Sequence, residues 1–406
     1  MKYKPYPKYK ESGVAWLGEV PEGWELLIGK HLFSNRREKA KEIDEQLAVT
    51  QKYGVIPQSL YMKNENQKLV LALKGTSNFR HVEKNDFVIS LRSFQGGLEF
   101  SNYSGCVSPA YTVLTSRKRV IFQFYTYLFK SIPYIKALQS STDSLREGKS
   151  ITYEQFGFIL LPLPLLKEQK KIANYLDQKT QKIDTLIEKQ QTLIKLLKEK
   201  RQAVISHAVT KGLDNDISDW QIKKVKFNLT LQNKKITIDK QEVIALENIE
   251  SKSGKYIKTE SSYKGEDVAF QKGDILFGKL RPYLAKVFEC KNEGVAFGDL
   301  LVFRPNREMD STFVFYSMLS DKFIAIVDSS TYGTKMPRAS VDFINEMRMS
   351  TPPLKEQKAI AHYLDQKTNQ IDTLITKSTK AIELLKERRT ALISAVVTGK
   401  VKVNDE

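Results

Sequence analysis

Apolar residues recur at alternating spacings of three and four along two long stretches of this 406-residue chain. The first stretch carries Ile172, Leu176, Ile183, Leu186, Leu193, Leu197 and Val204, and the second carries Ile360, Leu364, Ile371, Leu374, Ala381, Leu385 and Leu392. This spacing is typical of a helix whose apolar stripe packs on another helix, as in a coiled coil. Lys179, Gln190 and Lys200 interrupt the first stripe, so the predicted seam is broken.

Each stretch is predicted to form one long helix whose apolar stripe belongs to the core, and the alternative is that part of the stripe meets partner helices. Prolines precede both stretches, and neither contains glycine or proline before Gly212 and Gly399 near their ends. Proline favours the first turn of a helix, and glycine favours its end. About 40 residues that rise about 1.5 Å each make a helix about 60 Å long. We expect the two helices to pair with each other antiparallel.

The two stretches are copies of one sequence. Residues 167–210 reappear as residues 355–398 at a constant offset of 188, with about two thirds of the positions identical. A period this long is not that of a stacked repeat protein. It indicates the duplication of a whole module, made of a globular domain and a helix.

A weaker repeat joins the two regions that precede these helices. Its paired segments are residues 23–33 with 219–229, 84–90 with 272–278, and 105–114 with 294–303. They are short runs of β-branched and aromatic residues between Gly, Asn, Asp and Pro, a pattern typical of antiparallel strands. Elsewhere the two regions differ at almost every position. The sequence therefore predicts an α/β (α+β) chain in which one scaffold, used twice, carries two different recognition faces.

Composition narrows the class of protein. The only two cysteines, Cys106 and Cys290, are far apart, which excludes a disulfide framework and a cysteine-based zinc motif and favours a reducing cytoplasm. No run approaches the roughly 18 apolar residues of a membrane span, and the first ten residues lack the apolar run of a signal peptide. No HExxH motif, phosphate-binding glycine loop or dinucleotide fingerprint is present.

Net charge points to a polyanionic partner. The chain carries a formal charge of +18, of which residues 1–166 hold +8 and residues 212–354 only +1. Neutralising phosphates releases condensed counterions, so such an excess favours nucleic acid, although basic proteins of ribosomes or anionic lipid surfaces share it. In the second region, any DNA contact must come from locally clustered cations.

Several motifs resemble one known family, the specificity subunit of type I restriction–modification systems. Residues 6–25 resemble the start of its first target-recognition domain, and the doubled signal of proline, KEQ, YLDQKT and IDTLI resembles its two spacer repeats. Residues 333–347, GTKMPRASVDFINEM, match a further family pattern, from which the first domain departs at residues 141–156. The resemblance covers essentially the whole chain.

The resemblance implies an architecture and a set of partners. Two target-recognition domains, residues 1–164 and 212–352, would be separated by two antiparallel coiled-coil-like spacer helices, residues 165–211 and 353–406, with pseudo-two-fold symmetry. Each domain would read one half of a bipartite site in double-stranded DNA. The helices would set the unread spacer and dock two methyltransferase (modification) subunits, and restriction/translocase subunits would join the full complex. This chain would hold no cofactor, since S-adenosylmethionine, ATP and Mg would be bound by those partners.

Side chains that contact base edges or phosphates are expected in loops. Arg and Lys suit guanine and phosphate, whereas Asn and Gln suit adenine. The candidates in the first domain are Arg36, Arg37, Arg80, Arg92, Ser93, Gln95 and Arg146, and those in the second are Lys279, Arg281, Tyr283, Lys335 and Arg338. Plainer interpretations are an exposed hairpin with solvated charges around Arg92 and a structural ion pair that involves Arg281 or Arg338.

The helix charges Lys195, Lys198, Lys200 and Arg201 are expected to be a solvated face. The chain is therefore interpreted as a non-catalytic DNA-recognition subunit. One alternative is a coiled-coil scaffold whose globular ends bind proteins without reading DNA. A stand-alone nuclease or methyltransferase is a third, which the absence of catalytic motifs disfavours.

Overall fold

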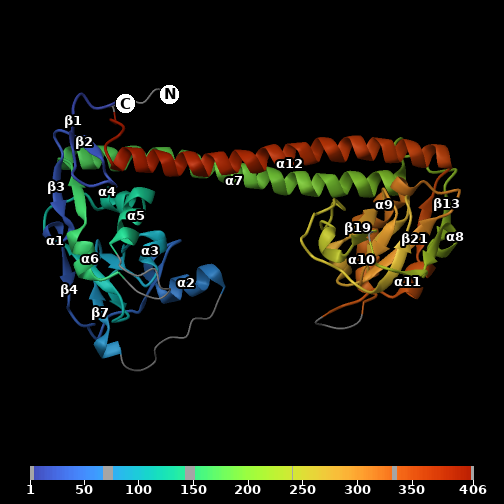
Figure 1. Cartoon of the computed structure of the whole chain (residues 1–406), viewed down its shortest axis with the longest axis horizontal. Helices are drawn as coiled ribbons and strands as arrows, with labels where there is room; N and C mark the ends of the chain where they lie inside the picture. The colour runs from blue at the N-terminus through green and yellow to red at the C-terminus, as the bar shows by residue number, and fades with distance from the viewer. Residues whose placement is uncertain (1–3, 67–75, 142–150, 240, 332–335, 404–406) are drawn as a thin grey trace. The chain divides into compact units, whose positions relative to one another are not determined.

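The computed structural model describes residues 4–66, 76–141, 151–239, 241–331 and 336–403 (Figure 1). The chain forms two compact units. Unit 1 comprises Met1–Lys189 and Ala381–Glu406, and unit 2 comprises Gln190–Lys380. Each unit has its own sheets and its own hydrophobic core, so each is described by itself.

Both predicted long helices are confirmed. Helix α7 spans Leu166–Lys211 and helix α12 spans Leu354–Val397. Gly212 follows α7 with a φ of +71°, and Gly399 lies two residues beyond α12 with a φ of +76°. A left-handed residue at this place ends a helix by satisfying its last carbonyl groups, which glycine does without steric cost.

The central sheet of unit 1 has four antiparallel strands. In spatial order they are β4 (Phe33–Arg36), β11 (Thr112–Ser116), β8 (Phe87–Ile89) and β9 (Glu99–Phe100). Three further pairs are β7 (Arg80–Val82) with β10 (Gly105–Val107), β5 (Leu47–Thr50) with β6 (Gly54–Pro57), and β1 (Tyr9–Glu11) with β2 (Glu19–Pro21). Strand β3 (Glu25–Ile28) pairs with β12 (Leu160–Leu163), which leads into α7.

Short helices cover these strands. They are α1 (Gly29–Leu32), α2 (Gln58–Glu65), α3 (Ser93–Gly96), α4 (Phe122–Phe129), α5 (Ile132–Ser140) and α6 (Tyr153–Phe158), with a 3-10 turn η1 at Thr76–Asn78. Helix α6 begins with a capping box, in which the Thr152 hydroxyl accepts from Gln155 N and the Gln155 side chain accepts from Thr152 N. Such reciprocal bonds satisfy two orphan amides of the first turn.

Unit 2 repeats this plan. Its central sheet runs β14 (Leu229–Gln232), β21 (Leu300–Pro305), β18 (Ile275–Gly278) and β19 (Val287–Glu289), and its second sheet runs β15 (Lys235–Thr237), β17 (Glu266–Phe270), β20 (Gly294–Ala296) and β16 (Glu242–Ile244). Strand β13 (Gln221–Lys224) pairs with β22 (Arg348–Thr351) ahead of α12. The helices are α8 (Val225–Asn228), α9 (Ser311–Leu319), α10 (Asp321–Ser329) and α11 (Val341–Glu346), with 3-10 turns η2 (Leu246–Asn248) and η3 (Pro282–Leu284).

The weak sequence repeat is a repeat of topology. Strands β8 and β18 lie within the segments 84–90 and 272–278, and the order β4-β11-β8-β9 matches β14-β21-β18-β19. In the second layer, β16 pairs parallel with β20, and unit 1 has a parallel bridge from Gln46 to Cys106 at the same place. The prediction of one frame used twice is therefore confirmed.

Each unit buries one end of each long helix in its core. In unit 1, Ile172 and Leu176 of α7 and Val396 of α12 join an aromatic cluster around Phe33 and Phe129. In unit 2, equivalent helical residues join a cluster that contains Phe303 and Phe313. Burying each apolar side chain contributes about 1.5–3 kcal/mol, so the helix ends are integral to the folded units.

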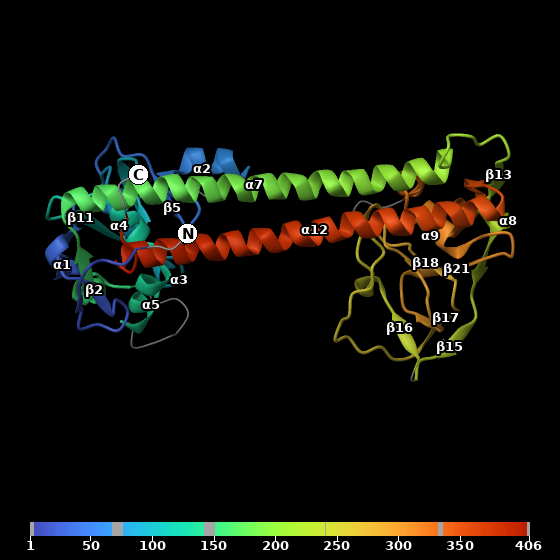
Figure 2. The same cartoon turned by 90° about the horizontal axis from the view of Figure 1, so that it is seen from above.

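The two helices pack antiparallel inside each unit (Figure 2). In unit 1, Asp184 of α7 pairs with Arg389 of α12 at 2.9 Å, and in unit 2 Arg201 of α7 pairs with Asp372 of α12 at 3.2 Å. The expected antiparallel pairing is confirmed within both units. The expectation that Arg201 is a solvated charge is wrong, because only 7% of its side chain is exposed.

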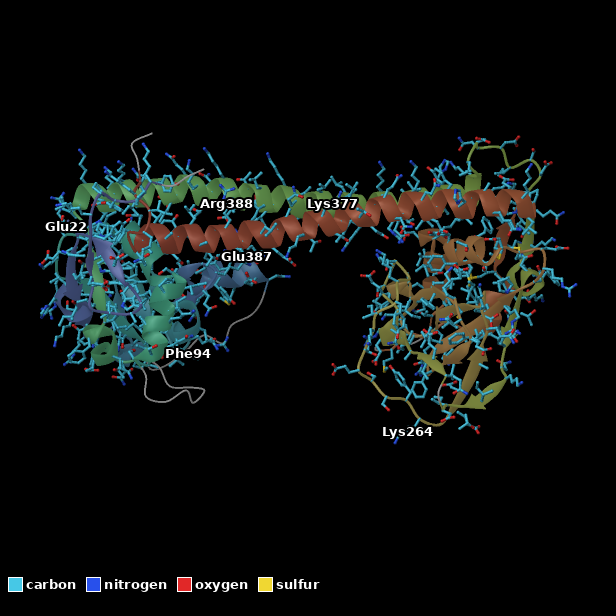
Figure 3. All side chains as sticks on the ribbon, turned by 45° about the horizontal axis from the view of Figure 1, so that its top comes forward. Glu22, Phe94, Lys264, Lys377, Glu387 and Arg388 are labelled. Atoms are coloured by element: carbon cyan, nitrogen blue, oxygen red, sulfur yellow. The ribbon has the colours of Figure 1, made fainter. Side chains whose placement is uncertain are left out.

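The apolar stripe is only partly core. Ile172, Leu176, Ile183 and Leu197 are buried, but Leu186, Leu193 and Leu374 are 42–49% exposed. The expectation of a core position is wrong at these three leucines, and the alternative that part of the stripe meets partner helices stays a prediction. The other three charges of the expected solvated face, Lys195, Lys198 and Lys200, are exposed, so the expectation is confirmed for them. Lys377, Glu387 and Arg388 of α12 are exposed as well (Figure 3). In the part of the chain that the structure describes, none of the helices combines the length and apolarity that a membrane crossing requires.

Candidate nucleic-acid interface

A buried glutamine fixes each domain to the start of its long helix. The Gln169 amide accepts from Ile121 N at 2.9 Å and donates to Pro164 O at 2.7 Å. Gln357, 188 residues later, accepts from Asp310 N and donates to Pro352 O, both at 2.8 Å. Both side chains are fully buried. The glutamine of the repeated KEQ motif therefore joins helix, preceding strand and domain through hydrogen bonds.

A tyrosine provides a second junction in each unit. Tyr127 donates to Asp177 at 2.7 Å, and Tyr316 donates to Asp365 at 2.8 Å. Burial raises the pKa of Tyr127 to about 12, so the hydroxyl stays a donor at neutral pH. The aspartate of the YLDQKT motif thus docks the domain on its long helix in both units.

Arg36, a DNA-contact candidate, is used inside unit 1. Its Nε donates to the buried Asp86 at 2.8 Å, and its Nη atoms also reach Glu38 and Glu83. Only 11% of the side chain is exposed. Burial raises the pKa of Asp86, and the guanidinium of Arg36 opposes that rise. This placement favours a structural role for Arg36.

In unit 2, an arginine on a different strand pairs with the equivalent aspartate. Arg304 on β21 holds Asp274 with two bonds of 2.8 Å. By strand register, Arg304 stands where unit 1 has Thr115, and Arg36 stands where unit 2 has Gln232. The same buried carboxylate therefore keeps a guanidinium partner in both units. In unit 1 this partner comes from β4, the second strand away from β8, and in unit 2 it comes from β21, the strand next to β18.

The loop around α3 contains three of the unit 1 candidates. Arg92 and Gln95 are exposed, and the structure gives neither side chain a partner among the described residues. Ser93 is buried, and its hydroxyl accepts from Ser90 N at 2.8 Å, which shapes the loop. Gly97 has a φ of +77° and lies so close to Phe129 O that a Cβ would be 1.9 Å from it. The loop is thus pinned to α4 while it presents Arg92 and Gln95 outward.

Two further candidates of unit 1 lie outside this loop. Arg37 is exposed beside Arg36. Arg80 donates to Pro109 O at 3.3 Å and to the Asn35 side chain at 3.4 Å, both at the edge of the hydrogen-bond range. Arg146 lies outside the described residues.

The structure brings together the two candidate loops of unit 2. Arg281 N donates to Pro337 O and Ala339 N donates to Lys279 O, each at 2.8 Å, across a bridge between Leu280 and Arg338. Backbone pairing therefore joins residues 279–283 and 337–339 into one surface, which we call the platform. These segments are about 57 residues apart in the sequence.

Asp299 neutralises the base of this platform. It lies 3.5 Å from Lys279 and 3.2 Å from Arg338. Arg338 is 57% exposed, so this ion pair leaves much of its guanidinium free, and the proposed structural ion pair exists for Arg338. Sequence reasoning did not single out Asp299, because the apolar run around it, GVAFGDLLVF, does not link it to Lys279 or Arg338.

The tip of the platform is exposed at Arg281 and Tyr283. Arg281 adopts a φ of +50°, which is uncommon for a side-chain-bearing residue, and Tyr283 in turn η3 is 47% exposed. Such outliers are maintained only where the surroundings require them and cluster at functional sites. Lys335 lies outside the described residues.

The described residues contain no group of three or more His, Cys, Asp and Glu side chains that could hold a metal ion. The candidate loops of both units carry exposed cations, an amide and an aromatic, namely Arg92, Gln95, Arg281, Tyr283 and Arg338. These groups suit hydrogen bonding to base edges and phosphates.

Comparison with known proteins decides the family. The family described as "Type I restriction modification DNA specificity domain" matches the chain twice, over residues 21–196 and 215–384. The chain belongs to this type I specificity family. Its members include the type I restriction enzyme MjaVIII specificity subunit of Methanocaldococcus jannaschii, which is 24% identical over 95% of both chains. The EcoDI specificity subunit of Escherichia coli is 23% identical over 63% of this chain and 66% of its own length.

Solved structures share the specificity-family fold. The HsdS subunit from Thermoanaerobacter tengcongensis aligns with a TM-score of 0.60 at 14% identity, over 94% of this chain and 98% of that one. A chain from a structure that concerns complex assembly and conformational transition of the type I R-M system aligns with a TM-score of 0.73 at 15% identity, over 93% and 98%. The expected α/β fold with two recognition domains and a long helix pair is confirmed.

Proposed function

We propose that this chain selects the DNA target of a type I restriction–modification complex, with each unit reading one half of a bipartite double-stranded site. The observation that carries this proposal is the contrast between scaffold and surface. Strand order, the glutamine junction and the tyrosine junction repeat in both units, whereas the outward loops differ in sequence and shape. Independent reading of two different half-sites requires one scaffold, present twice, with two different recognition surfaces.

The reading groups are proposed to be the free loop side chains. In unit 1 they are Arg92 and Gln95, and in unit 2 they are Arg281, Tyr283 and Arg338, with Lys279 at the base of the platform. Arg fits the two acceptors of guanine, and Gln fits the donor and acceptor of adenine in the major groove. Arg36 is left out of this set because its guanidinium is occupied.

The long helices are proposed to set the unread spacer and to dock two methyltransferase subunits. Two positions of the repeat are exposed leucines in both copies, Leu186 with Leu374 and Leu196 with Leu384, all 47–55% exposed. Unit 1 thus carries Leu186 and Leu384, and unit 2 carries Leu374 and Leu196. Two equivalent apolar surfaces suit two copies of the same partner, because a repeated surface presents the same contacts twice.

We propose that the chain supplies recognition and that its partners supply chemistry. S-adenosylmethionine, ATP and Mg would then be bound by the methyltransferase and restriction/translocase subunits. The target adenine would be flipped out of the duplex into the methyltransferase, which cannot reach a stacked base.

An exchange of domains tests the proposal. Residues 1–160 are replaced by the first domain of another family member, and the host methylome is sequenced with the natural and the hybrid chain. One half-site should change and the other should stay. Altered sequence in both halves contradicts independent reading. A gel shift of the chain with its methyltransferase that shows no specific retardation at low salt favours the alternative of a protein-binding scaffold.

A further inference from the structure

A hollow of about 460 Å³ opens in unit 1 beside the exposed candidate Arg92. Strand β5, helix α2 and the loop before α3 form its walls. The side chains that matter here are Gln51, Tyr61, Arg92, Glu99 and Tyr111. The hollow thus combines aromatic walls with polar groups that face a shared space, which is the composition of a binding pocket.

Glu99 is the unusual member of this lining. Its side chain is 2% exposed, and Oε1 accepts from the Lys130 ammonium, whereas the buried Oε2 has no hydrogen-bond partner among the described residues. A buried unpaired acceptor costs free energy, more so when it is charged. Burial raises the pKa of Glu99, and Lys130 opposes the rise. Oε2 is therefore an acceptor that the domain leaves unsatisfied.

The scaffold itself does not need this ion pair. Glu99 stands opposite Val88 in strand pairing, and the equivalent pair in unit 2 is Phe288 opposite Leu276. Lys130 follows α4 directly before Ser131, and the residue directly before the equivalent Ser320 is Leu319, which is fully buried. Unit 2 thus builds the same place from apolar side chains. A buried ion pair gives little net stability over an apolar pair, so its presence in unit 1 calls for a role other than folding.

We propose that this pocket reads the exocyclic amino group of one adenine or cytosine in the half-site of unit 1, with Glu99 Oε2 as the acceptor. The inference rests on the proposed function and adds the chemical group that one face recognises. Amino groups of adenine and cytosine are donors on the major-groove edge, and carboxylates accept from them. Arg92 at the rim supplies a donor for phosphate or a neighbouring acceptor. Gln51 lies against Gly96, where a Cβ would come within 2.5 Å of its Nε2, so its amide is held at the wall.

The test uses the full chain in complex with its methyltransferase subunits and DNA in which every position of the target is randomised. Glu99→Gln keeps the shape of the side chain and replaces one acceptor by a donor. Preference for an amino-bearing base should fall about tenfold at one position of the unit 1 half-site, since a good base contact discriminates by about 1–3 kcal/mol. Preferences throughout the other half-site should be unchanged.

Two further variants separate recognition from folding. Glu65→Gln is a matched control, because Glu65 lines the same hollow but is engaged by Lys52 at 2.7 Å, and its base preferences should equal those of the natural chain. The double variant Glu99→Leu with Lys130→Leu replaces the ion pair by two apolar side chains, as unit 2 does with Phe288 and Leu319, so it should fold with an undiminished Tm and lose the same single preference.

The outcomes are distinguishable. Natural base preferences at every position in both Glu99 variants would overturn the pocket's role while leaving the proposed function intact. A loss of preference in Glu65→Gln equal to that in Glu99→Gln would also overturn it, because the effect would then not depend on the unsatisfied acceptor. Selection of random DNA by the natural complex without any preferred sequence would overturn the proposed function, and this inference with it.

Discussion

Arg201 and Asp372 form an ion pair that joins α7 to α12 within unit 2, and the duplication repeats it as Arg389 and Asp184 in unit 1. Each partner is offset by 188 residues from its counterpart, so the two pairs are equivalent. Their surroundings are not. Arg201 is 7% exposed and also donates to Lys252 O at 3.2 Å, whereas Arg389 is 37% exposed.

This difference predicts unequal effects of the same substitution. Arg201→Ala should lower the free energy of unfolding of unit 2 by about 3 kcal/mol or more, because it leaves a mostly buried carboxylate with fewer partners. Arg389→Ala should cost unit 1 no more than about 1 kcal/mol, as is usual for exposed pairs. Urea unfolding of both variants measures the difference, and equal losses would contradict it.

The glutamine junction predicts a large effect from a small change. Gln357→Glu replaces a buried donor that holds Pro352 O at 2.8 Å and Glu308 O at 3.0 Å. Two carbonyl oxygens would lose their donor and face a carboxylate, so unit 2 should lose about 2 kcal/mol or more. Gln370→Glu, on the exposed face of the same helix, is the control and should change the Tm little. A similar Tm for both variants would count against the junction.

The platform of unit 2 predicts a one-sided loss of recognition. Arg281→Ala should weaken selection at one position of the second half-site by about tenfold, through a lost base contact. Asp299→Asn should weaken several positions of that half-site together, since Lys279 and Arg338 would lose their shared carboxylate. Selection from randomised DNA by the methyltransferase complex measures both. Any change in the first half-site would contradict the assignment.

The continuity of each long helix from residues of one unit to residues of the other predicts how the spacer is set. The units divide after Lys189 on α7 and after Lys380 on α12. Four residues inserted at each place would add about 6 Å of helix. We expect the unread spacer to grow by about one or two base pairs, since base pairs stack about 3.4 Å apart. Methylome sequencing should show both half-sites unchanged, and an altered half-site would count against the proposal.

Buried thiols predict how the native chain reacts. Cys106 in unit 1 and Cys290 in unit 2 are at most 1% exposed, and burial raises the pKa of Cys106 from 9.0 to about 11. The folded thiol therefore keeps its proton more tightly than the unfolded one, so its contribution to the stability of unit 1 is full below pH 9 and is lost as the pH rises towards 11. Alkylation by iodoacetamide at pH 8 should be slow until each unit unfolds. Rapid labelling of the folded chain would contradict this expectation.

Much of the architecture was predictable because it depends on periodic patterns. The alternation of three and four predicted both long helices, and the offset of 188 predicted the shared frame. The pattern could not tell which apolar positions the domains would cover. Leu186 and Leu374 continue the spacing of the stripe, but they are exposed and lie outside both hydrophobic cores.

Candidate site residues were harder to predict because charge type does not reveal partners. Arg36 and Arg92 look alike in the sequence, yet one lies on a strand beside the buried Asp86 and the other lies in an exposed loop. Asp299 and Glu99 gave no sequence signal as acidic residues in a protein expected to bind DNA. Their significance comes from tertiary neighbours that are distant in the chain.

The exchanged positions of Arg36 and Arg304 restrict where related chains can be spliced. A hybrid sheet that combines β4 of unit 1 with β21 of unit 2 in place of β11 would put two guanidinium groups against one buried aspartate. The reciprocal hybrid would place side chains equivalent to Thr115 and Gln232 beside that aspartate and would provide no guanidinium. Hybrid chains whose crossover lies within a four-stranded central sheet are therefore expected to misfold. A crossover in the repeated helices keeps every buried charge with its native partner. The repeated helices are therefore the places at which domains of different specificity can be joined.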